Sequence, residues 1–82
     1  MTHPLFSEMA LTHDIPDHGL RRGDVVRLVD HHIAQGGREG YSVEVCNAVG
    51  DTIVVTTVDA SSLEPLQSDE VFSIRHLKSA VA

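Results

Sequence analysis

The chain has 82 residues, 41% of them hydrophobic, and a formal net charge of −6 from 12 acidic and 6 basic side chains. This length allows one domain with a small core, and no apolar run approaches the roughly 20 residues that cross a bilayer. The acidic balance weighs against general binding to nucleic-acid backbones, which requires clustered Lys and Arg. Without a recognisable signal peptide, and with Cys46 as the single cysteine, we expect a cytoplasmic protein without membrane contact.

The N-terminal ten residues show no clear hydrophobic period. We expect residues 1–10 to form an arm that is either flexible or docked on the domain. A first strand is predicted over residues 10–15, where apolar side chains recur at every second position. Pro16 ends this strand because it has no backbone N–H to donate.

A turn bounded by Gly19 and Gly23 leads into the second predicted strand, residues 24–32. Glycine adopts positive φ at little steric cost, so the chain can reverse direction at both positions. The strand is rich in β-branched residues and has apolar groups on both faces. This pattern indicates a bulge near Val26 or Arg27.

The clearest hairpin follows a glycine-rich loop, residues 34–40. Residues 41–47 alternate regularly, with Tyr41, Val43 and Val45 facing inwards. A Gly-Asp turn then leads into residues 52–58, whose β-branched side chains are typical of a central strand.

The last part of the chain is harder to assign. Residues 60–66 predict a 3₁₀ turn closed by a proline, with Leu63 and Leu66 filling one end of the core. Residues 70–77 favour a final strand, and a short helix is the alternative because apolar residues also recur at a spacing of three. Residues 78–82 are expected to be a frayed tail.

Together these segments predict an all-β fold, a small antiparallel barrel of five or six short strands with one 3₁₀ turn, over residues 11–77. No amphipathic segment is long enough to form the helix of a βαβ crossover. Closure of the sheet would remove edges that a chain of this size cannot otherwise cover.

The segment 14–25, Asp-Ile-Pro-Asp-His-Gly-Leu-Arg-Arg-Gly-Asp-Val, resembles the opening of a family of short bacterial proteins classed only as a domain of unknown function. The resemblance continues through residues 40–45, 50–52 and 63–66. The order of features is also similar to that of SH3-like barrels, which include ribosome-associated KOW modules and the β subunit of nitrile hydratase. This resemblance implies an SH3-like barrel and no established activity. The loop at residues 30–38 departs from the pattern, because it is longer and carries two adjacent histidines.

Six histidines raise the question of a metal site. His31 and His32 are adjacent, so on a strand they point to opposite faces and cannot hold one ion together. The sequence has neither a Cys-x-x-Cys nor a His-x₃-His pattern. A site built from His13, His18 and Asp17 remains an alternative, but we expect neither a metal nor another cofactor.

The residues that could catalyse a reaction have simpler structural explanations. Cys46 is expected to face outwards, with no histidine at a local spacing that would activate it. The glycines of residues 36–40 lack the Lys-Ser/Thr ending of a phosphate-binding loop. Asp14, Asp17 and Asp24 are expected to cap the central turn through bonds to backbone N–H groups. We therefore expect a protein that is not an enzyme.

The remaining function is protein interaction, and we expect a small binding module that is accessory or regulatory to a larger, unidentified protein partner. Edge-strand pairing between copies would also give a homo-oligomer. The candidate partner-binding residues are Arg21, Arg22, Arg27, Arg38 and Tyr41. With Tyr41 as a stacking surface, the same arginines support the alternative of a KOW-like RNA-binding module, against which the acidic total and the few aromatic residues weigh. A histidine-based metal-binding protein is the second alternative.

Overall fold

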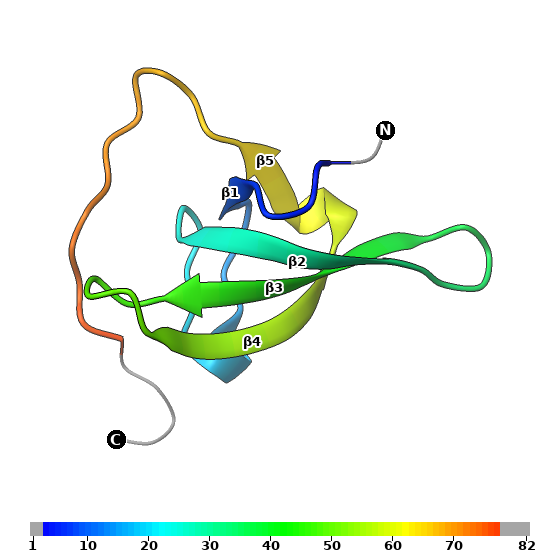
Figure 1. Cartoon of the computed structure of the whole chain (residues 1–82), viewed down its shortest axis with the longest axis horizontal. Helices are drawn as coiled ribbons and strands as arrows, with labels where there is room; N and C mark the ends of the chain where they lie inside the picture. Colours follow the sequence, from blue (N-terminus) through cyan, green and yellow to red (C-terminus); the bar gives the residue numbers. More distant parts are fainter. Residues whose placement is uncertain (1–2, 78–82) are drawn as a thin grey trace.

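The computed structural model describes residues 3–77, which form five antiparallel strands in one sheet with the order β4-β3-β2-β1-β5 (Figure 1). The strands are β1 (Glu8–Leu11), β2 (Val25–Ile33), β3 (Glu39–Cys46), β4 (Thr52–Asp59) and β5 (Leu63–Pro65). The predicted all-β class is confirmed. The sheet curls around its core, but β4 and β5 are not hydrogen-bonded to each other, so the ladder is open between these two strands. Residues 78–82, expected to be a frayed tail, lie outside the described residues.

Two 3₁₀ turns, η1 (Pro16–His18) and η2 (Ala60–Ser62), connect the strands, where the sequence predicted one. The second lies inside the segment predicted to hold such a turn. The first begins at Pro16, whose fixed φ suits the start of a helical turn. It ends at Gly19, which adopts the left-handed conformation with φ of 70°. No helix in the described part of the chain has the length and hydrophobicity to span a membrane.

Strand β1 is shorter and earlier than the predicted strand at residues 10–15. It starts at Glu8, inside the segment expected to be an arm, and pairs with β2 on one side and β5 on the other. Beyond Leu11 the chain leaves the sheet, and Ile15 returns only as an isolated bridge to Leu20. The alternation that suggested a longer strand therefore belongs to a bend, because those residues have no neighbouring strand along most of their length.

The hairpins built by β2, β3 and β4 follow the prediction closely. Their observed bounds differ from the predicted strands by at most two residues, and the inward-facing residues of β3 are buried as expected. The predicted bulge lies further along β2, where the register shifts between Leu28 and Asp30. Strand β2 continues to Ile33, so the adjacent His31 and His32 lie within this strand and not in a loop.

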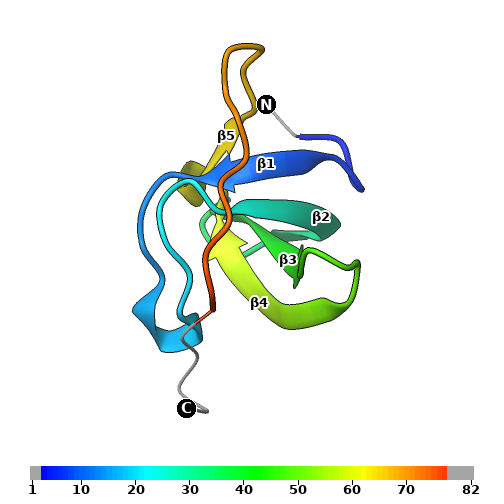
Figure 2. The ribbon, with the colours of Figure 1, turned by 90° about the vertical axis from the view of Figure 1, so that its left-hand side faces the viewer.

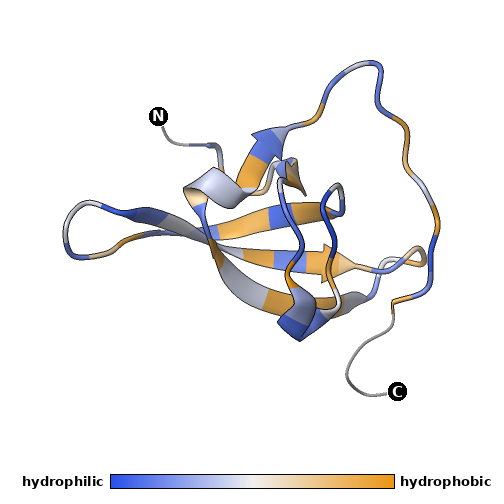
Figure 3. Cartoon of the chain, turned by 180° about the vertical axis from the view of Figure 1, so that it is seen from behind, coloured by the Kyte–Doolittle hydropathy of each residue, from blue (hydrophilic) through white to orange (hydrophobic). Residues whose placement is uncertain are grey.

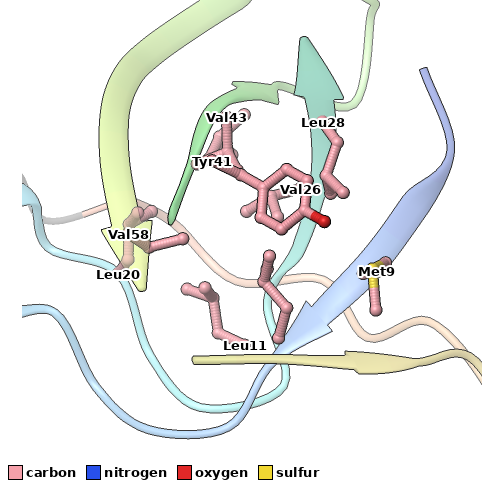
Figure 4. Packing of buried hydrophobic residues seen from close by; sticks show 10 residues of the cluster. Met9, Leu11, Leu20, Val26, Leu28, Tyr41, Val43 and Val58 are labelled. Carbon is pink, nitrogen blue, oxygen red and sulfur yellow. The ribbon is translucent and has the colours of Figure 1, made fainter. Parts of the chain in front are cut away.

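The core lies inside the curl of the sheet and is mainly aliphatic (Figure 4). Its fully buried members are Leu11, Leu20, Val26, Leu28, Tyr41 and Val43. Leu63 is also buried, as predicted, but Leu66 is exposed and does not fill the end of the core. Leu66 follows the last residue of β5, so the chain has already left the sheet at this position.

Residues 66–77 form neither the predicted strand nor the alternative helix. They run as an extended segment past the turn between β3 and β4, at the left of Figure 1 and across the front of Figure 2. Several of their apolar side chains are exposed to solvent, and Figure 3 shows these hydrophobic stretches along the outside of the molecule. The period-two pattern of residues 70–77 therefore did not correspond to a paired strand.

Candidate functional site

The four arginines predicted to bind a partner do not line one edge of the sheet. Arg21 and Arg22 lie in the turn before β2, whereas Arg38 lies in the hairpin that follows it. Nine residues of β2 separate the two groups, which corresponds to about 30 Å of extended strand. The four arginines therefore do not form a single compact basic patch, because Arg21 and Arg22 lie near one end of β2 and Arg38 lies beyond the other.

Two of these arginines are also paired with acids. Arg27 on β2 lies 3.7 Å from Glu44 on β3, and the guanidinium of Arg38 donates to the carboxylate of Asp59 at 2.7 Å. Exposed pairs of this kind contribute little to stability, typically below about 1 kcal/mol. These pairs neutralise charge locally, because the positive charge of each arginine lies next to the negative charge of a carboxylate on β3 or β4.

Tyr41, the predicted stacking surface, is completely buried. It lies on the inward face of β3, and its hydroxyl accepts a hydrogen bond of 2.8 Å from the backbone N–H of His3. The His31 ring lies beside it, with ring centroids 4.9 Å apart. The prediction that Tyr41 faces inwards is confirmed, and for that reason its proposed role in stacking on a base is wrong.

The histidines of the sheet and the first bend have separate hydrogen-bonding partners. These contacts are His13 Nε2 to Ser62 Oγ at 2.8 Å, His31 Nε2 to Glu39 Oε2 at 3.3 Å and His32 Nε2 to Ser42 Oγ at 2.7 Å. Within residues 3–77, no three His, Cys, Asp or Glu side chains come close enough together to hold an ion. The alternative set of His13, His18 and Asp17 is therefore not assembled in this structure.

The acidic residues of the central turn act as predicted at two of the three positions. Asp24 accepts the backbone N–H of Arg21 at 2.8 Å, and Asp14 accepts that of Arg22 at 2.9 Å. The Asp24 bond closes the exposed turn before β2 on itself, and the Asp14 bond holds this turn against the bend that follows β1. Asp17 is exposed in η1, and no side-chain cap bond stabilises the start of that turn.

The outer edge of β4 is the feature that sequence reasoning did not single out. Strand β4 has eight residues and lies at one edge of the sheet, so one side of its backbone has no neighbouring strand among residues 3–77. Residues 52–58 contain no charged residue and no proline. Ile53 and Val55 are 42% and 63% exposed, respectively, on the outward face.

The opposite edge of the sheet is different. Strand β5 has three residues and includes Glu64 and Pro65. A short strand with a charge and a proline is a common way to protect a sheet edge from pairing with another chain. Within residues 3–77, the sheet therefore has one protected edge and one long edge that is open and is uncharged over residues 52–58.

A protein family described as a domain of unknown function (DUF4926) matches residues 5–65. The chain belongs to this family. The match begins before β1 and ends with β5, so the DUF4926 domain of this chain is the whole five-stranded sheet. No curated protein and no solved structure matches the chain.

The described residues beyond the DUF4926 match form the extended segment 66–77. The guanidinium of Arg75 donates to the carboxylate of Asp24 and to the carbonyl oxygen of Gly19, the latter at 3.2 Å. Leu77 packs against the core cluster. In contrast, Val71 and Ile74 are 89% and 92% exposed. The segment is thus held near its C-terminal end, whereas its middle is open to solvent.

We expect Arg75→Ala to release this segment from the DUF4926 domain. Limited digestion with chymotrypsin should then cut after Phe72 several times faster than in the unmodified protein, because a protease needs a mobile, accessible backbone. Arg27→Ala, which removes an exposed ion pair within the sheet, is the matched control and should leave the rate unchanged. Equal rates in all three proteins would show that Arg75 does not hold the segment.

Proposed function

We propose that this chain is a small, non-enzymatic protein-interaction module that binds an extended segment of a partner along the open edge of β4. One observation carries the proposal: the edge strand β4 is eight residues long, uncharged over residues 52–58 and unpaired on its outer side within the described chain. Strand addition at such an edge uses backbone hydrogen bonds for affinity and alternate side chains for selectivity.

The burial along β4 supports this proposal. Val54 and Thr56 face the core side but are only half-buried, whereas their partners on β3, Val45 and Val43, are buried. The difference arises because β4 has a neighbouring strand on one side only among residues 3–77. An added strand would cover the exposed parts of Val54 and Thr56, and on the other face it would contact Ile53 and Val55.

The expected SH3-like barrel is part of the same proposal. It is supported by the curled antiparallel sheet, by the 3₁₀ turn η2 immediately before the last strand, and by the position of β1 between β2 and β5. The KOW-like RNA-binding alternative has less support, because Tyr41 is buried and Arg27 and Arg38 are paired with acids.

The test is a comparison of two Val→Lys substitutions in an affinity capture from a lysate of the source cells. Val55→Lys places a charge in the middle of the open edge, a change that natural edge strands use to prevent pairing. Val49→Lys makes the same change in the exposed hairpin turn next to β4 and is the matched control. We expect Val55→Lys to reduce partner recovery at least tenfold, and Val49→Lys to retain it.

Circular dichroism of both variants checks that the sheet remains folded. Equal recovery by the two folded variants would contradict binding through β4. Partners that are lost on nuclease treatment, with capture unaffected by Val55→Lys, would instead support the RNA-binding alternative.

A further inference from the structure

We propose that the strand that adds to β4 is β4 of a second copy, so that two chains form a symmetric dimer with one continuous sheet. This inference rests on the proposed function, since it uses the same edge, and it adds the identity of the partner and the register. A two-fold interface brings the same surface of each copy together. The surface must therefore be compatible with itself in charge and in shape.

The charge distribution favours self-pairing at β4. With a net charge of −6, two copies repel each other over most of their surface. Residues 52–58 are uncharged, and two of the acids beside them are paired with arginines, Glu44 with Arg27 and Asp59 with Arg38. Asp51, the third neighbouring acid, lies just before the first residue of the strand. At this edge two acidic molecules can approach without placing like charges opposite one another.

The two edges of the sheet also determine the size of the assembly. Pairing of β4 with a different edge of the next copy would form an open chain of molecules, whereas pairing of β4 with itself is complete after two copies. Because β5 is three residues long and includes Pro65, it offers little backbone for pairing. A closed dimer through β4 is therefore the assembly that these edges favour.

The outward-facing residues select the register. Residues that lie opposite each other in an antiparallel pair share one face of the sheet, so a symmetric β4 pair has a single residue type on its two-fold axis. With Val54 on the axis, each Ile53 lies opposite Val55 of the other copy, and both exposed apolar residues are covered. With Val55 on the axis, Ile53 would lie opposite Thr57. We therefore assign the axis to Val54.

Disulfide trapping tests both the dimer and its register. In a Cys46→Ser background, Ile53→Cys and Val55→Cys proteins are purified separately, reduced, mixed in equal amounts and oxidised gently. Opposite residues have Cα atoms about 4.5–5.5 Å apart, within the range that a disulfide bridges. Each residue lies about 8 Å from its own counterpart in the other copy, which is too far. We expect the mixed disulfide to exceed either homodimer at least tenfold.

A Val49→Cys protein in the same background measures non-specific oxidation of an exposed thiol. Efficient homodimers of Val55→Cys alone would overturn the assigned register. Cross-linking no faster than that of Val49→Cys, together with a monomer mass in sedimentation equilibrium, would overturn self-pairing altogether. That second result would leave the proposed function to the capture experiment with Val55→Lys, so the two failures are distinguishable.

Discussion

Replacement of Tyr41 by alanine is expected to lower the free energy of unfolding by about 3–5 kcal/mol, the usual cost of removing a buried aromatic side chain. Tyr41 is fully buried, and Figure 4 shows it among the other core side chains. The ring of His31 lies beside it, with ring centroids 4.9 Å apart. An 82-residue domain has little stability to spare, because small domains bury a smaller fraction of their surface. Urea unfolding followed by circular dichroism measures the loss.

Tyr41→Phe is the matched control. It keeps the ring and removes only the hydroxyl that accepts the backbone N–H of His3, so it should cost about 1 kcal/mol. A loss below about 1 kcal/mol for Tyr41→Ala would contradict the buried position of the ring. It would also restore Tyr41 as a candidate stacking surface for a nucleic acid.

The second large effect is expected for Asp24→Ala, at about 2 kcal/mol of unfolding free energy. The Asp24 carboxylate accepts both the backbone N–H of Arg21 in the turn and the guanidinium of Arg75 in the C-terminal segment. One substitution therefore loosens two parts of the chain that are far apart in sequence. Both side chains of the ion pair are about three-quarters buried, so solvent screens this pair less than an exposed one.

A double-mutant cycle with Arg75→Ala separates the two contributions. If Asp24 and Arg75 interact directly, the loss for the double variant should be smaller than the sum of the two single losses. Asp17→Ala in the neighbouring 3₁₀ turn is the matched control, and as an exposed residue it should change stability by less than about 0.5 kcal/mol. Additive losses for Asp24 and Arg75 would contradict the tethering of the C-terminal segment.

The local sequence pattern correctly predicted the strands and turns whose structure depends mainly on residues close together in the chain. The alternation of residues 41–47 is visible without knowledge of neighbouring strands, and β3 follows it. The carboxylates around Gly19 and Gly23 bond to backbone groups three and eight residues away, within the same bend and turn, so their capping role was also predictable from sequence. In contrast, residues 70–77 have a strand-like pattern but pair with no strand in the described part of the chain, because pairing depends on where the other strands place a free edge.

The candidate site was largely beyond prediction for the same reason. That β4 lies at the end of the sheet follows from the strand order, which the residues of β4 do not encode. The prediction treated residues 52–58 as a central strand because their β-branched content is typical of one. An uncharged, β-branched sequence of this kind is unusual at an exposed sheet edge. It indicates an interaction surface only once the strand order shows that β4 lies at the edge. The separation of Arg21 from Arg38 likewise depends on the length of β2.

Site-specific photocrosslinking tests the central claim, that the edge of β4 is the interaction surface, most directly. A photoreactive amino acid is placed at Val55, or at Glu64 on the protected edge as a control, and the protein is irradiated in the source cells. The β4 position is predicted to give a discrete covalent adduct with a polypeptide, either a second copy or another protein, and the β5 position to give none. No adduct at Val55, or equal adducts at both positions, would contradict the account.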